Sequence, residues 1–147
     1  MEKQLSLHQV DPYAWFSVQA NFIKNKNFKQ LDTENLYEEL LEMGESFARE
    51  LESNLVILFC HLLKWEMQPA KRSKSWIFSI VEHKKRVLKR LSITPSLKYR
   101  LFDIAQDAWP LAIIKASNET GIDADIFPKN LWFDLDQFLD TEQVYTL

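Results

Sequence analysis

Residues 32–76, DTENLYEELLEMGESFARELESNLVILFCHLLKWEMQPAKRSKSW, decide the class of fold. Asp32 is a good helix N-cap, and apolar residues then recur at spacings of three and four as far as Trp65, which is the period of one helical face. Gln68-Pro69 ends the pattern and a basic turn follows. A helix of this length would measure roughly 50 Å, more than a compact domain of this size, so we expect a bend at Gly44.

The most apolar part of this helix is Leu55–Leu63, which is apolar on nearly every side. Such a segment is either buried all round or covered by a partner chain, and it is far too short to span a membrane. Cys60 lies within it and is the only cysteine, which excludes an internal disulfide and a cysteine-based zinc site. We expect Cys60 to be a small buried hydrophobe. The first residues contain no apolar signal-peptide core, so we expect a cytoplasmic protein without membrane contact.

Helix start and stop signals recur along the rest of the chain. They predict helices from Asp11-Pro12 to about Lys24, from about Ser75 to Leu91, from Thr94-Pro95 to about Glu119 with a kink at Pro110, and a short last helix capped by Asp134. With two glycines, the chain lacks the usual material for β-turns. We therefore predict an all-α protein: a four-helix up-and-down bundle with a long second helix and a short C-terminal helical appendix. Residues 1–147 would form a single domain, with residues 1–10 frayed at the N-terminus.

A line of polar residues borders the apolar stripe of the long helix. At 100° per residue, its members fall within about 60° of one another; they are Glu39, Glu50, Asn54 and His61. With His83 from the next helix, Glu39, Glu50 and His61 would be the centre of a metal-dependent or acid/base enzyme. The Glu-x-x-His signature of di-metal bundles is missing, so we favour structural hydrogen bonds and assign no catalytic residue, metal or cofactor.

Charge is strongly sorted along the chain. Residues 32–52 hold eight acidic residues and one basic residue, whereas residues 71–100 hold ten basic residues and one acidic residue. A basic helix beside a tryptophan can follow a phosphate backbone. The nucleic-acid contacts would then be Lys71, Arg72, Lys74, Lys85, Arg86, Lys89 and Arg90. The simpler interpretation is that this basic face lies against the acidic helix or the acidic tail.

Three motifs follow one another in a specific order: His61-Leu62-Leu63-Lys64-Trp65, Gln68-Pro69 and Arg72-Ser73-x-Ser75-Trp76. Together with Asp32-x-Glu34-Asn35-Leu36, Met43-Gly44, Ser96-Leu97 and Phe127-Pro128, they resemble the bacterial "domain of unknown function 29" family. The resemblance implies a helical bundle and no assigned activity. It also implies one cluster where the long helix turns into the next, made of Glu39, His61, Lys64, Trp65, Arg72, Ser75 and Trp76.

The preferred functional hypothesis is a small protein-interaction module that binds an unknown protein or itself. Self-association would use Leu55–Leu63 or the aromatic-rich C-terminal tail. Nucleic-acid binding and the metal-dependent or acid/base enzyme remain the alternatives.

Overall fold

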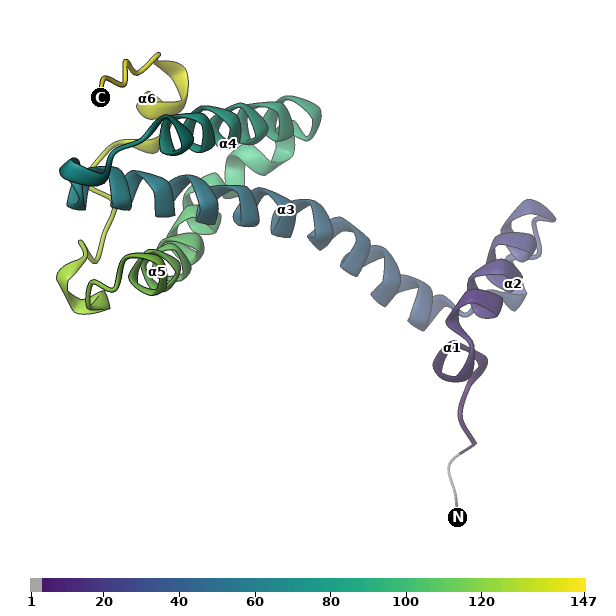
Figure 1. Ribbon diagram of the computed structural model, residues 1–147. Coiled ribbons are helices and arrows are strands. Elements are labelled where there is room, and N and C mark those ends of the chain that lie inside the picture. Colours follow the sequence, from purple (N-terminus) through teal and green to yellow (C-terminus); the bar gives the residue numbers. More distant parts are fainter. Residues whose placement is uncertain (1–3) are drawn as a thin grey trace. The chain divides into compact units, whose positions relative to one another are not determined.

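The computed structural model describes residues 4–147, and every regular element within them is helical. The helices are α1 (Leu7–Val10), α2 (Pro12–Lys24), α3 (Thr33–Met67), α4 (Lys74–Ile93), α5 (Leu101–Thr120) and α6 (Leu135–Asp140), joined in part by short 3₁₀ turns (Figure 1). No helix in this described part is long and apolar enough to cross a membrane. The all-α prediction is confirmed.

Several helix ends follow the capping signals of the sequence. The predicted start at Thr94-Pro95 is an exception, because Pro95–Arg100 form a 3₁₀ helix and α5 begins only at Leu101. The carboxylate of Asp11 accepts a hydrogen bond from the Ala14 N–H at the start of α2, and Ser73 caps α4 in the same way. Gly121 ends α5 in the left-handed conformation with φ 75°, which a glycine adopts without a Cβ penalty. Pro110 lies inside α5 without ending it.

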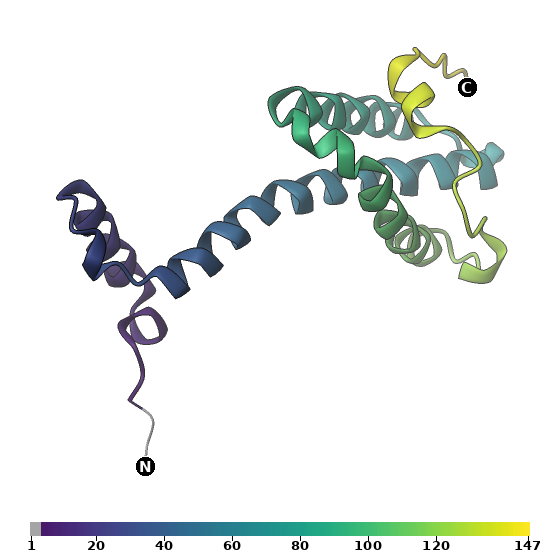
Figure 2. The ribbon, with the colours of Figure 1, turned by 180° about the vertical axis from the view of Figure 1, so that it is seen from behind.

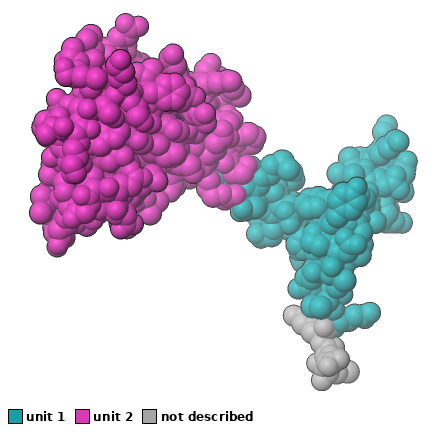
Figure 3. Space-filling view, viewed as in Figure 1, with its two compact units in different colours: residues 1–45 teal, residues 46–147 magenta. Residues whose placement is uncertain are grey.

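The chain forms two compact units, residues 1–45 and residues 46–147, which we call unit 1 and unit 2 (Figure 3). Helix α3 contributes its first turns to unit 1 and the rest to unit 2, and it is uninterrupted at Gly44. The boundary falls next to this glycine, where the sequence pattern predicted a bend. The two units share helix α3. The expectation that residues 1–147 form a single domain stays a prediction.

The hydrophobic core lies in unit 2. Helices α4 and α5 lie on opposite sides of the second half of α3, as both ribbon views show (Figures 1 and 2). Leu55, Leu58, Phe59 and Leu63 of α3 are fully buried in the core that these helices form. Intramolecular packing therefore covers most of Leu55–Leu63, and this segment does not present the free surface for self-association that the sequence suggested.

The rest of the core comes from the partner helices and the tail. Helix α4 supplies Ile80, Val87 and Leu91; α5 supplies mostly small residues and Trp109. The tail adds Phe127 and Leu139. The indole Nε1 of Trp109 donates a hydrogen bond of 2.9 Å to the carbonyl of Pro128, which ties the tail to α5.

Unit 1 is organised around Asp32, the N-cap of α3. Its carboxylate accepts hydrogen bonds from the indole Nε1 of Trp15 at 3.0 Å and from the side-chain amide of Asn35 at 2.7 Å. Its N–H donates to the side chain of Gln19 at 2.8 Å. Trp15 and Gln19 are the two buried residues of α2, so this helix is joined to the start of α3 mainly through one residue, Asp32.

Two details of the predicted architecture change. A four-helix up-and-down bundle is not confirmed, because unit 2 contains three long helical segments and the short α6, while α2 belongs to unit 1. Of residues 1–10, expected to fray, residues 1–3 lie outside the described part and residues 7–10 form α1. The imidazole of His8 lies 2.7 Å from Glu39 and edge-on to Trp15, which holds α1 in place.

Candidate functional site

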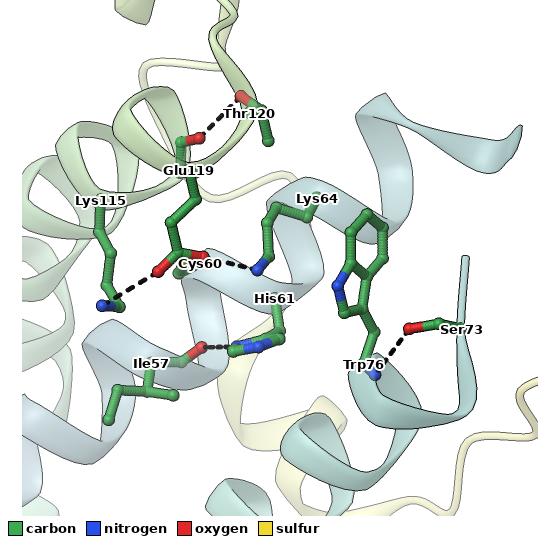
Figure 4. A network of polar contacts seen from close by, with 10 residues as sticks. Ile57, Cys60, His61, Lys64, Ser73, Trp76, Lys115, Glu119 and Thr120 are labelled. Carbon is green, nitrogen blue, oxygen red and sulfur yellow. Dashed lines mark hydrogen bonds and ion pairs between the residues drawn. The ribbon is translucent and has the colours of Figure 1, made fainter. Parts of the chain in front are cut away.

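A polar cluster lies where α3 ends, α4 begins and α5 ends (Figure 4). Helix α3 contributes the neighbours Cys60 and His61 and, one turn later, Lys64; α5 contributes Lys115 and Glu119 one turn apart. Three helices therefore meet through a small number of charged groups beside the hydrophobic core.

Glu119 is the centre of this cluster. Its Oε2 lies 2.6 Å from Nζ of Lys64, and its Oε1 lies 3.1 Å from Nζ of Lys115. The thiol of Cys60 also points to Oε2, at 3.8 Å. Lys64 is buried whereas Glu119 is about one-third exposed, so the carboxylate is the member of the pair that contacts solvent.

Two cation–aromatic contacts flank the ion pair. Nζ of Lys64 lies 5.1 Å from the ring centre of Trp76 in α4, which ties α4 to the Lys64–Glu119 pair. The Arg72 guanidinium lies 4.6 Å from the ring centre of Trp65, and its Nε donates to the Trp65 carbonyl at 2.9 Å. Arg72 thereby caps a carbonyl at the C-terminal end of α3.

The protonation states follow from burial and charge. Burial alone would raise the pKa of Glu119, but the hydrogen bonds from Lys64 and Lys115 hold that pKa below its ordinary value. Burial, together with the Glu119 charge, raises the pKa of the Cys60 thiol to about 11. A nucleophilic cysteine needs a lowered pKa, so Cys60 is an inert thiol at neutral pH.

His61 also has a structural hydrogen bond. Its Nδ1 lies 2.8 Å from the carbonyl of Ile57 one turn earlier, which requires a proton on Nδ1. Burial lowers the pKa of His61, so the ring is neutral at physiological pH. The cluster therefore contains a neutral imidazole (His61), a protonated thiol (Cys60) and a carboxylate paired with two lysines (Glu119). These groups connect the helices, and none of them is an activated nucleophile or a general base.

The structure brings together five of the seven residues that the family resemblance placed in one cluster: His61, Lys64, Trp65, Arg72 and Trp76. Ser75 is exposed at the start of α4, where Ser73 is the capping residue. The structure does not bring Glu39 to these residues. Glu39 lies in unit 1, about eight turns before the end of α3, and its carboxylate lies 2.7 Å from His8, a residue that sequence reasoning did not select.

The other members of the polar line on α3 each find a separate partner. Glu50 forms an ion pair with Arg90. The side-chain oxygen of Asn54 lies 3.0 Å from Nδ1 of His83. Thus Glu39, Glu50, His61 and His83 are not joined into one site, and no group of three metal-ligating side chains within residues 4–147 is placed to hold a metal ion.

The basic residues proposed for nucleic-acid binding divide into two sets. Arg72 donates a hydrogen bond to the Trp65 carbonyl, Arg86 forms an ion pair with Glu82, and Arg90 forms one with Glu50. The four lysines of the set are exposed: Lys71, Lys74, Lys85 and Lys89. The basic face of α4 is therefore only partly neutralised by acidic residues.

Sequence reasoning missed Glu119, the residue on which the cluster depends. A signal was present, because Lys115 and Glu119 are an i,i+4 pair near the end of α5. Nothing in the sequence, however, pairs a residue of α5 with Lys64, which lies 55 positions earlier.

The fold and the cluster define an all-helical protein in which an ion pair and a cation–aromatic contact join three helices beside the core. Its residues 7–144 match the family model described as "Domain of unknown function DUF29", and the chain belongs to that family. No curated protein and no solved structure matches the chain.

Proposed function

We propose that this protein is a self-associating interaction module, and that unit 1 is the surface on which a second copy docks. The observation that carries the proposal is the poor burial within unit 1, where Trp15 and Gln19 are the only buried residues among residues 4–45. The proposal places the protein in the bacterial cytoplasm, where a free thiol such as Cys60 stays reduced.

Large apolar side chains are exposed along every helix of unit 1. They are Leu5, Leu7, Val10, Tyr13, Phe16, Val18, Ile23, Phe28, Tyr37, Leu40, Leu41 and Met43. Leu40 is 66% exposed and Tyr37 is 61% exposed, one turn apart on the same side of α3. Exposed apolar side chains in this number are typical of a surface that contacts another protein.

The size of unit 1 points the same way. Chains of about 40 residues rarely bury enough surface to be stable without a disulfide, a metal or a partner chain. A specific interface covers about 800 Å² on each partner, and a dozen large apolar side chains are ample to supply the core of one. Docking a second copy would thus provide the burial that unit 1 lacks.

Charge favours a second copy as the occupant. Unit 1 carries a basic corner with Lys24, Lys26 and Lys29, which are exposed and form no ion pair within residues 4–147. The start of α3 carries exposed Glu34 and Glu38. In a two-fold symmetric dimer each contact occurs twice, so the basic corner of each copy can face the acidic helix of the other.

Sedimentation of the full chain over a range of concentrations tests the proposal. We expect a monomer–dimer equilibrium that shifts toward monomer in Tyr37→Ser/Leu40→Ser. The matched control is Phe78→Ser/Phe102→Ser, which removes two equally exposed aromatic groups from unit 2. A wild-type chain that stays monomeric at every concentration, or a control that dissociates equally, would refute self-association.

A further inference from the structure

We propose that a groove in unit 2, between α3 and α4, binds a ligand carrying two or more phosphate groups. The groove has a volume of about 410 Å³. Its charged lining consists of four cations and two carboxylates: Lys85, Arg86, Lys89, Arg90, Glu50 and Glu82. The site lies apart from the surface proposed for self-association, and it does not depend on that proposal.

The two carboxylates are already paired with the two arginines. Glu50 pairs with Arg90, and Oε1 of Glu82 lies 3.0 Å from Nε of Arg86. Lys85 and Lys89 are exposed and have no hydrogen bond or ion pair within the described part of the chain. The groove therefore keeps a net charge of +2 on two lysines that have no intramolecular anion.

The spacing of these lysines suits successive phosphates. Residues i and i+4 share a helical face, and they are separated by about 6 Å along the axis. Lys85 and Lys89 thus follow one another along the groove. A chain of phosphates can use both ammonium groups at once, whereas a single small anion would contact them less fully.

Arg86 offers further donors beside the lysines. It uses only Nε in its bond to Glu82, and its terminal nitrogens have no hydrogen bond within the described part of the chain. A phosphate oxygen is a strong acceptor for guanidinium groups. Arg90 adds positive charge to the lining, but its Nε is buried and its terminal nitrogen is paired with Glu50.

Phosphate groups in this arrangement could come from a compact polyphosphate or from the backbone of a nucleic acid. Two probes separate these sources: sodium tripolyphosphate, followed by calorimetry, and a fluorescently labelled oligothymidylate, followed by anisotropy. Both are titrated into the full chain at several salt concentrations. Tripolyphosphate binding at least as tight as oligonucleotide binding would indicate a compact ligand, and binding of the oligonucleotide alone would indicate a backbone.

The decisive variant is Lys85→Gln/Lys89→Gln. We expect it to weaken binding by about tenfold or more, and to reduce the slope of log affinity against log salt for the oligonucleotide by about 1.4, or about 0.7 per lost phosphate contact. The control Lys98→Gln/Lys129→Gln removes the same charge from exposed positions elsewhere in unit 2 and should leave both quantities unchanged.

Two results would overturn the proposal. One is that neither probe binds the wild-type chain at low salt. The other is that the control loses as much affinity as the groove variant, because attraction would then come from overall charge and not from this groove. Repeating the titration with Tyr37→Ser/Leu40→Ser separates the two proposals, since a monomeric chain should bind the probes as the wild type does.

Discussion

Units 1 and 2 are stabilised by different interactions, although one helix runs through both. In unit 2 the side chain of Phe59 is fully buried, and the Lys64–Glu119 pair lies at the edge of a large apolar core. In unit 1 the side chain of Leu40 is 66% exposed, and α2 is joined to α3 mainly by hydrogen bonds to Asp32. The apolar face of α3 thus forms a core in unit 2, where neighbouring helices cover it, and stays largely exposed in unit 1, where they do not.

The largest expected effect is in the core of unit 2. Phe59→Ala removes a ring that contacts Trp109 and Phe133, and we expect the free energy of unfolding to fall by about 3–5 kcal/mol. Urea unfolding followed by circular dichroism measures this. The control Phe102→Ala removes an exposed ring and should cost less than about 0.5 kcal/mol. Equal losses in the free energy of unfolding would mean that burial does not determine the cost of removing either ring.

The ion pair at the edge of this core should matter less. Glu119→Gln leaves the buried ammonium of Lys64 without a counter-charge, and we expect a loss of about 1–3 kcal/mol at neutral pH. The control Glu82→Gln, at an exposed i,i+4 pair, should cost only about 0.3–0.5 kcal/mol.

The contribution of Glu119 should also depend on pH. Its pKa is lower in the folded protein than the ordinary value of 4.5, so the folded state is stabilised above pH 4.5 and loses this stabilisation as the pH falls through the lower, folded pKa. Unfolding experiments should therefore show a smaller difference between wild type and Glu119→Gln at about pH 3 than at about pH 7. A difference that stays constant with pH would contradict a charged Glu119.

Each unit has a helix that is capped by an aspartate, Asp32 in unit 1 and Asp134 in unit 2. Asp32→Ala removes the acceptor for Trp15 and Asn35, and we expect a local loss of about 1–2 kcal/mol. Hydrogen exchange should then show faster exchange in α2 and unchanged exchange in α5. The matched control is Asp134→Ala, which removes the cap of α6 in unit 2. Equal acceleration in α2 and α5 after Asp32→Ala would mean that the two units open together, as a single domain would.

The smallest effect should come from two neutral histidines of unit 2. Burial lowers the pKa of both His61 and His83, so the unfolded chain binds protons more readily near pH 6.5. Stability should therefore decrease as the pH falls from about 8 to about 5.5. We expect this slope to be shallower in His61→Gln/His83→Gln, as measured by urea unfolding. An unchanged slope would place the titrating groups elsewhere.

Several features could be predicted from sequence because they depend on neighbours within one or two turns. The N-cap of α2 at Asp11, the end of α5 at Gly121 and the cap of α6 at Asp134 were all recognisable from residue type and spacing. The burial of Cys60 followed equally from its apolar surroundings.

The candidate site was predicted in part. The family resemblance placed Lys64, Trp65, Arg72 and Trp76 in one cluster, and in the structure they lie close together on either side of one turn. Glu119 was missed because its pairing with Lys64 joins helices far apart in sequence. The resemblance also placed Glu39 in the cluster, but α3 is 35 residues long and Glu39 lies near its other end.

Local sequence patterns were sufficient to predict that the chain is helical, where most of its helices begin and end, and which side of each helix is apolar. These properties follow from local backbone preferences and helical periodicity. The local patterns did not predict α1 or the start of α5 at Leu101. The three-dimensional structure was needed to show which apolar faces are covered, which charges are paired, and which lysines of α4 have no partner within residues 4–147. These outcomes depend on contacts between helices distant in the chain, which no local pattern specifies.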